Sequence, residues 1–201
     1  MPTLLLTGFD KWHNKPYNAS WEMLAGAELQ LPNRWEAVIQ KLPVSWEDAP
    51  QQLQRAITED VKATVCFGMG GGNEIRCERI AVNLIDPLLR DVDGLVRGSE
   101  YVVPGGPPAY WTRLPFRRVL HALETHKIPC ALSHHAGAYL CNYLFYWLLH
   151  HLTENERDIV AGFIHVPPLD DLGGLEKSTL SRAANIIANT VVEFADGRSR
   201  I

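Results

Sequence analysis

Three residues far apart in the chain could together perform nucleophilic catalysis: Cys141, His165 and Glu78. A thiol attacks carbonyl groups as the thiolate, so its ordinary pKa of about 8.5 must be lowered by a helix N-terminus or a neighbouring cation. Imidazole can accept the thiol proton and later return it to a leaving amine, while a carboxylate fixes the tautomer of the imidazole. This combination of side chains is the chemistry of a cysteine hydrolase.

The predicted secondary structure gives Cys141 a position suited to a nucleophile. Residues 140–149 are apolar almost all round, which predicts a buried helix that follows a strand at 129–133. Cys141 lies at the start of this helix, where the helix dipole and the free N–H groups stabilise an anion. We expect these N–H groups, with those of the glycine-rich turn at 68–72, to bind the oxyanion of a tetrahedral intermediate.

His165 and Glu78 lie on two further predicted strands, at 159–166 and 78–85. A right-handed parallel crossover would place the strand of His165 beside the strand that leads to Cys141. We therefore expect the imidazole within reach of the thiol, with Glu78 as the carboxylate that orients it.

Each of these residues also has a purely structural interpretation. A cysteine at the start of an apolar helix is more often a small packed side chain than a nucleophile. His165 could be a hydrogen-bonded core histidine, and Glu78 could form an ion pair with its neighbour Arg79. A binding protein that keeps the fold without catalysis is therefore a competing hypothesis, which the reactivity of the Cys141 thiol tests.

The remaining sequence alternates short apolar runs with longer segments of helical period, which is typical of an α/β domain. Residues 86–108 are rich in Gly, Pro and Asp, and we expect a hairpin or flap there. Because no repeat or linker interrupts the pattern, we expect one domain over residues 1–201. The other expected strands are 3–7, 35–42 and 64–67, and the other expected helices are 18–31, 45–59, 112–126 and 178–192, with Asn18, Ser45 and Ser178 as N-caps.

Composition and charge exclude several classes of protein. A chain of 201 residues with 46% hydrophobic content can build its own core. Its formal net charge is −4 and its basic residues are scattered, so it lacks the positive patch that nucleic acids require. The apolar run at residues 3–6 is too short for a signal peptide or a membrane span. We expect a cytoplasmic protein with no nucleic-acid or membrane partner.

Cysteine and histidine spacings argue against disulfides and metals. The four cysteines show no Cys-x-x-Cys spacing, so we expect reduced thiols, with Cys66 and Cys130 in the core. The pairs at 134–135 and 150–151 are both His-His and lack carboxylate or cysteine partners at metal-binding spacing, so no metal is expected. The turn at 68–72 lacks the Lys-Ser/Thr of a phosphate-binding loop, which disfavours nucleotides.

Several segments of the chain carry a family likeness: LTGFD at 6–10 with NASWE at 18–22, ERIAVN at 78–83, GGPPAYW at 105–111, and CNYLFY at 141–146 with GFIHVP at 162–167. In this order they resemble the pyroglutamyl peptidase I (pyrrolidone-carboxylate peptidase) family of cysteine peptidases over nearly the whole chain. The resemblance implies a three-layer α/β/α sandwich with a mostly parallel, mixed central sheet. It also implies hydrolysis of N-terminal pyroglutamyl residues through a thioester, with a triad that matches Glu78, Cys141 and His165.

The same resemblance implies the partners of the protein and part of its pocket. The substrate would be a peptide with a blocked N-terminus, and no cofactor would be needed. The chain would form a homo-oligomer, a tetramer or a dimer. Phe9 matches an aromatic residue of the pocket that holds the lactam ring in this family.

The expected pocket departs from the family pattern at three places. Met69 and Gly70 stand where the family usually has Gln-Ala, so a hydrogen-bonding amide is replaced by a thioether, which is only a weak acceptor. Lys11-Trp12-His13 replaces a usual Pro-Phe-Gly, which makes Trp12 the candidate for the second aromatic residue of the pocket.

Near the nucleophile, Tyr139 and Leu140 replace a usual Phe-Val, and the His-His pair at 134–135 replaces a usual Tyr-Thr. We therefore expect Phe9, Trp12, Met69, Gly70 and Tyr139 to bind the substrate. Because a polar pocket loses discrimination when one hydrogen bond is removed, a related amidase for another cyclic or blocked N-terminal acyl group is the alternative.

Overall fold

A six-stranded mixed sheet forms the centre of the computed structural model, which describes residues 1–12, 15–32 and 34–198; His13 lies outside them. The strand order is β2-β1-β3-β8-β4-β7. All neighbouring strands are parallel except β4 and β8, so the sheet is mostly parallel, as predicted. The strands are β1 (Thr3–Phe9), β2 (Glu36–Leu42), β3 (Val61–Met69), β4 (Ile75–Glu78), β7 (Cys130–Ser133) and β8 (Val160–Val166).

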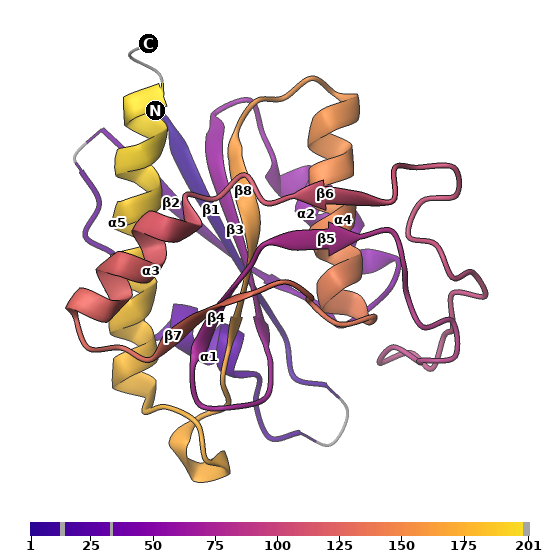
Figure 1. The fold of residues 1–201 in the computed structure, drawn as a ribbon, viewed down its shortest axis with the longest axis horizontal. Helices are drawn as coiled ribbons and strands as arrows, with labels where there is room; N and C mark the ends of the chain where they lie inside the picture. Colours follow the sequence, from indigo (N-terminus) through magenta and orange to yellow (C-terminus); the bar gives the residue numbers. More distant parts are fainter. Residues whose placement is uncertain (13–14, 33, 199–201) are drawn as a thin grey trace.

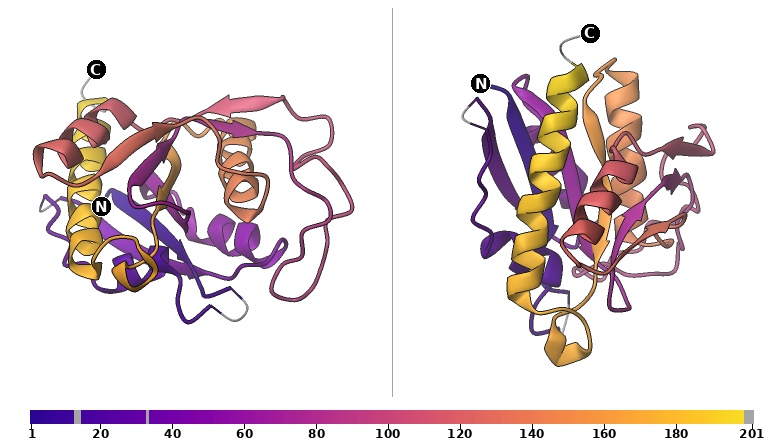
Figure 2. Two further views of the ribbon diagram at one scale, coloured as in Figure 1. Left: turned by 60° about the horizontal axis from the view of Figure 1, so that its bottom comes forward. Right: turned by 60° about the vertical axis from the view of Figure 1, so that its left-hand side comes forward.

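Helices cover both faces of this sheet, so the fold is the expected three-layer sandwich (Figure 1). One hydrophobic core lies between the sheet and α1, α3 and α5, and the other between the sheet and α2 and α4. The two further views show the same separation into layers (Figure 2). The helices are α1 (Ala19–Ala25), α2 (Asp48–Ala56), α3 (Phe116–Thr125), α4 (Leu140–Glu154) and α5 (Lys177–Arg198), with a short 3₁₀ turn, η1 (Asp170–Leu172).

The central strands are apolar because both of their faces are covered. All seven residues of β1 and all seven of β8 are buried, as expected for strands inside a parallel sheet with helices on both sides. Successive side chains of β1 enter opposite cores: Leu4 and Leu6 join one, Leu5 and Phe9 the other. The parallel strands therefore end at one common edge of the sheet, where α/β proteins usually bind ligands.

Two corrections concern the strands around Glu78. The single strand expected at 78–85 is interrupted at Arg79, so β4 belongs to the main sheet, while β5 (Ile80–Val82) pairs with β6 (Ala109–Trp111) in a separate antiparallel ribbon. Arg79 marks the break because its N–H donates to Ser133 and its carbonyl accepts from Thr112, which turns the chain away from the sheet.

The predicted neighbourhood of His165 was also wrong. The strand β7, which leads to Cys141, is not beside β8, because β4 lies between them and runs antiparallel to β8. A short glycine turn joins β3 to β4, and a turn so short reverses the chain direction. Glu78 is thereby placed beside the strand of His165.

Residues 83–108 join the two strands of the ribbon as a long excursion without helix or strand, visible at the right of Figure 1. The buried side chain of Asp91 organises it. One carboxylate oxygen accepts from the N–H groups of Asp93 and Leu95, and the other accepts from Trp46 N at 3.0 Å. These bonds hold the excursion against the segment that precedes α2.

Several helix boundaries differ from the prediction. The second helix begins at Asp48 after Glu47, so Ser45 is not its N-cap, although the Ser45 hydroxyl accepts from Asp48 N. The third begins at Phe116 rather than at residue 112. The first helix ends at Ala25 rather than near Leu31, because Gly26 closes it with hydrogen bonds to Glu22 and Leu24. The last helix begins at Lys177, so Ser178 lies inside its first turn and is not its cap. Among the helices that the structure describes, none combines the length and apolar character needed to cross a bilayer.

Candidate active site

The side chains of Glu78 and His165 meet between β4 and β8, where the two strands run antiparallel. His165 Nδ1 lies 2.7 Å from Glu78 Oε1, and both residues are buried, with exposed fractions of 6% and 1%. A carboxylate accepts only, so Nδ1 carries the proton and Nε2 is left to face another group. Glu78 thus fixes the orientation and the tautomer of the imidazole, as predicted from the chemistry.

Cys141 is the second residue of α4 and is half-buried beside the second core. Gly68 on β3 makes room for its sulfur, since a Cβ there would lie 2.8 Å from Cys141 Sγ and 2.8 Å from a ring carbon of Phe163. The first N–H groups of a helix have no acceptor within it, so the start of α4 presents free donors beside the thiol. These donors and the helix dipole favour a thiolate and an oxyanion at this position.

His165 is electrostatically coupled to Cys141. Burial alone lowers the pKa of the imidazole, but the charge of Cys141, a hydrogen bond with its sulfur, and the Glu78 carboxylate together raise this pKa to about 9. The imidazole is therefore protonated at neutral pH. The second oxygen of Glu78, Oε2, is buried without a hydrogen-bond partner among the described residues. The protonated imidazole therefore offsets most of the cost of burying this side chain.

The other three thiols have raised pKa values. Burial raises the pKa of Cys66 to about 12, and it also raises the pKa of Cys77 and of Cys130. Cys66 and Cys77 are buried in the core, whereas Cys130 is only half-buried. All four cysteines are free, and the raised pKa of these three disfavours their reactive thiolate form.

Asn142 is a positioning residue that the sequence analysis missed. Its buried side chain accepts from Val82 N at 3.0 Å and donates to the carbonyl oxygens of Val82 and Leu84 at 2.9 and 2.8 Å. These bonds clamp the start of α4 to β5, just beyond the strand that carries Glu78. An asparagine in an otherwise apolar helix was the available signal, because a buried amide requires partners.

A cavity of about 150 Å³ opens beside the Cys141 sulfur, with mostly apolar walls. Four of the predicted substrate-binding residues line it, namely Phe9, Trp12, Met69 and Tyr139, whereas Gly70 does not. The N–H of Gly70 donates to Val166 O at 2.8 Å, so the expectation that this N–H would bind the oxyanion was wrong. Three residues that the sequence analysis had not assigned to the pocket complete its wall: Asn18, Val44 and Leu140.

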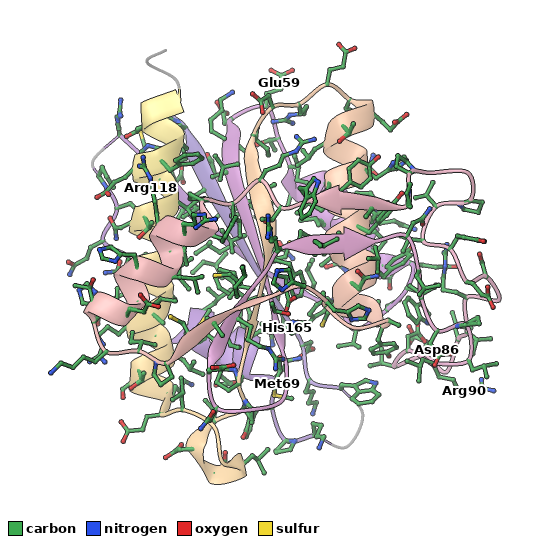
Figure 3. The ribbon with its side chains drawn as sticks, in the orientation of Figure 1. Glu59, Met69, Asp86, Arg90, Arg118 and His165 are labelled. Carbon is green, nitrogen blue, oxygen red and sulfur yellow. The ribbon has the colours of Figure 1, made fainter. Side chains whose placement is uncertain are left out.

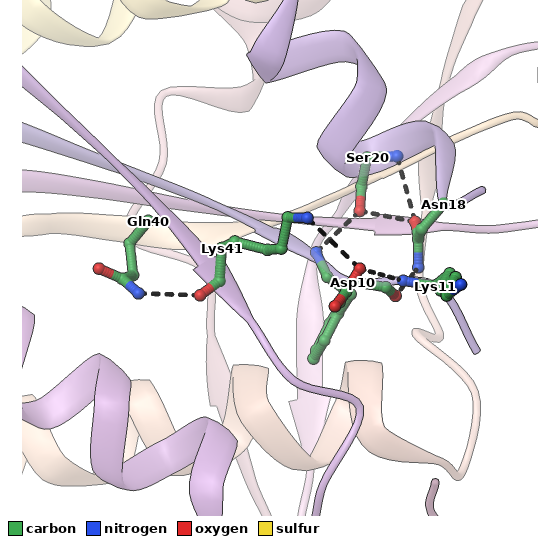
Figure 4. A network of polar contacts seen from close by, with 7 residues as sticks. Asp10, Lys11, Asn18, Ser20, Gln40 and Lys41 are labelled. Carbon is green, nitrogen blue, oxygen red and sulfur yellow. Dashed lines mark hydrogen bonds and ion pairs between the residues drawn. The ribbon is translucent and has the colours of Figure 1, made fainter. Parts of the chain in front are cut away.

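Asn18 lines the cavity and is also the N-cap of α1. Its side-chain oxygen accepts from Ser20 N and Ser20 Oγ, and its amide donates to Asp10 O, as Figure 4 shows. The hydroxyl of Ser20 in turn accepts from Phe9 N at 3.0 Å. The predicted helix cap is therefore confirmed, and the same network fixes the backbone of Phe9 at the pocket.

Tyr139 connects the cavity to the excursion. Its hydroxyl donates to Arg90 O at 2.6 Å, and its ring centroid lies 5.7 Å from that of Trp12 and 5.0 Å from that of Trp46. In Figure 3, Met69 and His165 lie near each other at the lower end of the sheet, with Asp86 and Arg90 to the right on the excursion. One wall of the pocket thus depends on a segment outside the main sheet.

The histidine pairs do not form a metal centre in the part of the chain that the structure describes. The pair at 134–135 follows β7 in a loop, and the other pair lies on α4. On this helix, the ring of His150 stacks on Tyr146, and its Nδ1 forms a hydrogen bond of 2.9 Å with the Tyr110 hydroxyl. The ring of His151 stacks on Trp147. These two side chains serve packing.

Comparison with known proteins agrees with this fold and site. Residues 2–192 match the family model described as pyroglutamyl peptidase. The pyrrolidone-carboxylate peptidase of Bacillus subtilis is 36% identical over 201 residues, which cover 95% of this chain and 93% of that protein. The fold is α/β, and the family match places the chain in the class of cysteine peptidases.

Solved structures show the same similarity. The pyroglutamyl peptidase I of Bacillus amyloliquefaciens superposes with a TM-score of 0.89 at 30% identity, covering 97% of this chain and 98% of that one. A mutant pyrrolidone carboxyl peptidase of Pyrococcus furiosus superposes with a TM-score of 0.88 at 27% identity, over 96% and 99% of the two chains. The chain belongs to the pyroglutamyl peptidase family.

Proposed function

We propose that this protein removes N-terminal pyroglutamyl residues from peptides, with Cys141 as nucleophile, His165 as acid and base, and Glu78 as the group that orients the imidazole. The observation that carries the proposal is the buried 2.7 Å contact between His165 and Glu78, with the imidazole coupled to a thiol at the start of a helix. Family membership supports the same reaction.

In the first half of the reaction, the Cys141 thiolate attacks the carbonyl carbon of the pyroglutamyl residue. The negative charge that develops on the carbonyl oxygen is stabilised by N–H groups in the first turn of α4. His165 Nε2 then gives its proton to the nitrogen of the leaving peptide, and the C–N bond breaks. The pyroglutamyl group remains attached to the sulfur as a thioester.

In the second half, the neutral imidazole accepts a proton from water, and the oxygen of that water attacks the thioester carbonyl. The C–S bond breaks, pyroglutamate leaves, and the thiolate and imidazolium are restored. Glu78 holds the ring through both halves, and its charge stabilises the protonated form. No group outside the chain is needed for these steps, and we propose that the enzyme uses no cofactor.

We further propose that the lactam ring occupies the cavity beside Cys141. Phe9 supplies a buried wall and Trp12 a wall at the mouth, where 39% of its surface is exposed. Met69 and Tyr139 complete the apolar surface, and Gly70 leaves space next to the reacting groups. A cavity of about 150 Å³ suits a small ring and excludes a full peptide chain.

We propose that the chain forms one domain over 1–201 and assembles as a homo-oligomer, a tetramer or a dimer. The single sheet shared by both cores supports one domain. The excursion supports self-association because it exposes several large apolar side chains, among them Leu88, which is 82% exposed. We place the protein in the cytoplasm, where a reduced catalytic thiol is maintained.

The test is hydrolysis of pyroglutamyl-aminomethylcoumarin under reducing conditions. We expect fluorescence to be released by the wild-type protein and not by the Cys141→Ser variant, which keeps nearly the same shape. Equal signals from the two proteins would contradict the proposal. Alkylation by iodoacetamide at mildly acidic pH gives a second arm: Cys141 should react far faster than the other three thiols, and equal rates would favour a protein without catalysis.

A related amidase is the second candidate, and the thioether of Met69 in the cavity wall favours it. A pocket without a side-chain amide at this position discriminates less well between the polar ring of pyroglutamate and other acyl groups. A panel of fluorogenic amides with different cyclic or blocked acyl groups separates the two functions. If pyroglutamyl is by far the best acyl group, the amidase hypothesis fails.

A further inference from the structure

Arg76 projects from the sheet on the same face as the catalytic groups. In the antiparallel register between β4 and β8, its partner is His165, and directly paired residues in antiparallel strands share a face. Glu78 is two residues further along β4 and faces the same way. The guanidinium of Arg76 thus belongs to the surface that carries the imidazole and its carboxylate.

Gly70 leaves the space that this guanidinium occupies. A Cβ at Gly70 would collide with Arg76 Nη2 and would lie 3.2 Å from His165 Cδ2. The guanidinium and the imidazole therefore both lie against the same glycine. Gly70 and Arg76 therefore fit each other in this chain.

The cation at this position has no internal partner. Within residues 1–12, 15–32 and 34–198, Arg76 is half-buried and its guanidinium makes no ion pair and no hydrogen bond. A guanidinium presents five donors in a planar fork and stays charged at every relevant pH. A half-buried, unpaired arginine beside reacting groups is therefore available to a ligand with a carboxylate.

The position of Arg76 defines which part of the substrate it meets. Along the C-terminal edge of the sheet, the order is Phe9 on β1, Met69 on β3, His165 on β8 and Arg76 on β4. Phe9 and Met69 line the cavity, so an acyl group bound there lies on the β1 and β3 side of the Cys141 sulfur. The leaving amine must lie on the other side, within reach of His165, and the next group along the peptide meets Arg76.

We propose that Arg76 binds a carboxylate on the first residue of the leaving peptide, so that the enzyme prefers substrates with a negative charge at that residue. The inference rests on the proposed peptidase function and deepens it. The carboxylate can be the side chain of an acidic residue or the free C-terminus of a pyroglutamyl dipeptide. Both offer two oxygens to the guanidinium fork.

Two matched pairs of substrates test the proposal and separate these two sources. One pair is pyroglutamyl-glutamate amide and pyroglutamyl-glutamine amide, and the other is pyroglutamyl-alanine with a free or an amidated C-terminus. The readout is the ratio of kcat/KM within a pair, measured from released pyroglutamate. We expect the wild-type protein to favour the charged member of at least one pair by about 5- to 20-fold, the size expected for a partly exposed charge-assisted contact.

Three variants test whether the preference for a charged substrate depends on the Arg76 side chain. Arg76→Met should bring the ratio close to one, whereas Arg117→Met, which removes the same charge from the exposed face of α3, should leave the ratio unchanged. Gly70→Ala should lower the ratio while it keeps the charge, because the new Cβ displaces the guanidinium. Added salt should also lower the wild-type ratio, which provides a test that requires no variant.

The outcomes distinguish this inference from the function on which it rests. If no pyroglutamyl substrate is cleaved, charged or neutral, the peptidase function fails and the inference falls with it. If all are cleaved but the wild-type ratio is near one in both pairs, or the preference persists in Arg76→Met, the role of Arg76 is overturned while the peptidase function stands.

Discussion

The catalytic groups and the acyl pocket lie side by side but differ in how they are held. Glu78, His165 and Cys141 come from two strands and a helix, and the first two are almost completely buried. The pocket wall, in contrast, includes Trp12 and Tyr139 from segments outside the strands and the helices, and Tyr139 is bonded to the excursion. Regular elements fix the chemistry, and irregular segments shape what the site accepts.

This difference predicts how substitutions in the two regions should act. The three residues of the proposed triad each lie in a packed element, where small displacements would remove catalysis. In the pocket, Trp12 and Tyr139 lie outside the sheet, so this part of the wall can change without disturbing it. Substitutions on the two sides should therefore have different kinetic signatures: kcat should fall on the catalytic side, and KM should rise on the pocket side.

The largest effect is expected from Glu78→Gln. The variant keeps the size of the side chain but removes the charge that stabilises the imidazolium. Its amide group can also donate a hydrogen bond to Nδ1, whereas a carboxylate only accepts one. We expect kcat to fall about 10²- to 10⁴-fold with little change in KM. The pKa of His165 should also drop, so the alkaline limb of the rate profile should move from near pH 9 to lower pH. An unchanged alkaline limb would show that Glu78 does not hold this proton.

Gly68→Ala tests how tightly the nucleophile is packed. A Cβ at this position would lie 2.8 Å from Cys141 Sγ, so the sulfur must move away from its position beside the imidazole. A displacement of about 1 Å can reduce a rate about 100-fold, and we expect a loss of roughly 10- to 100-fold in kcat. Gly71→Ala is the matched control, because a Cβ there meets no atom within 4 Å. Equal losses in both variants would mean that the strand end as a whole, rather than the sulfur, was disturbed.

Much of this catalytic side could be predicted from the sequence, because residue types and element ends carry the information. Cys141 at the start of an apolar helix and His165 at the end of an apolar strand were both placed correctly. The order of the strands was not, since β4 inserts between β7 and β8 through long-range pairing that no local pattern records. The correct pairing of Glu78 with His165 was therefore predicted from chemistry and not from topology.

The pocket side was harder to predict for a physical reason. Asn18 was recognised as a helix cap, but its place in the cavity wall depends on how the loop after β1 folds back. Val44 and Leu140 carry no chemical signal, because an apolar residue in a pocket wall looks like any core residue. Gly70 was assigned to the substrate from its loop, yet its N–H is already bonded to Val166.

Trp12→Ala sharpens the comparison from the pocket side. The indole forms part of the cavity wall and packs against Tyr139, with ring centroids 5.7 Å apart. Its removal should raise KM for pyroglutamyl substrates about 3- to 10-fold and leave kcat within about 2-fold, since the lost contact is made equally in the ground state and the transition state. Trp111→Ala, which removes an indole that is 64% exposed and outside the cavity wall, is the control. A large fall in kcat for Trp12→Ala would place this side chain with the catalytic groups instead.

The last prediction concerns stability, and it returns to the buried pair. The pKa of His165 rises from an ordinary 6.5 to about 9 in the folded protein, so the folded state binds this proton more tightly than the unfolded chain. The stabilisation is fully present below pH 6.5 and is lost as the pH rises through about 9. In urea unfolding, the difference in free energy between the wild-type protein and His165→Asn should therefore shrink across this window. A difference that stays constant, or grows toward alkaline pH, would show that the folded protein does not hold the imidazole in its protonated form.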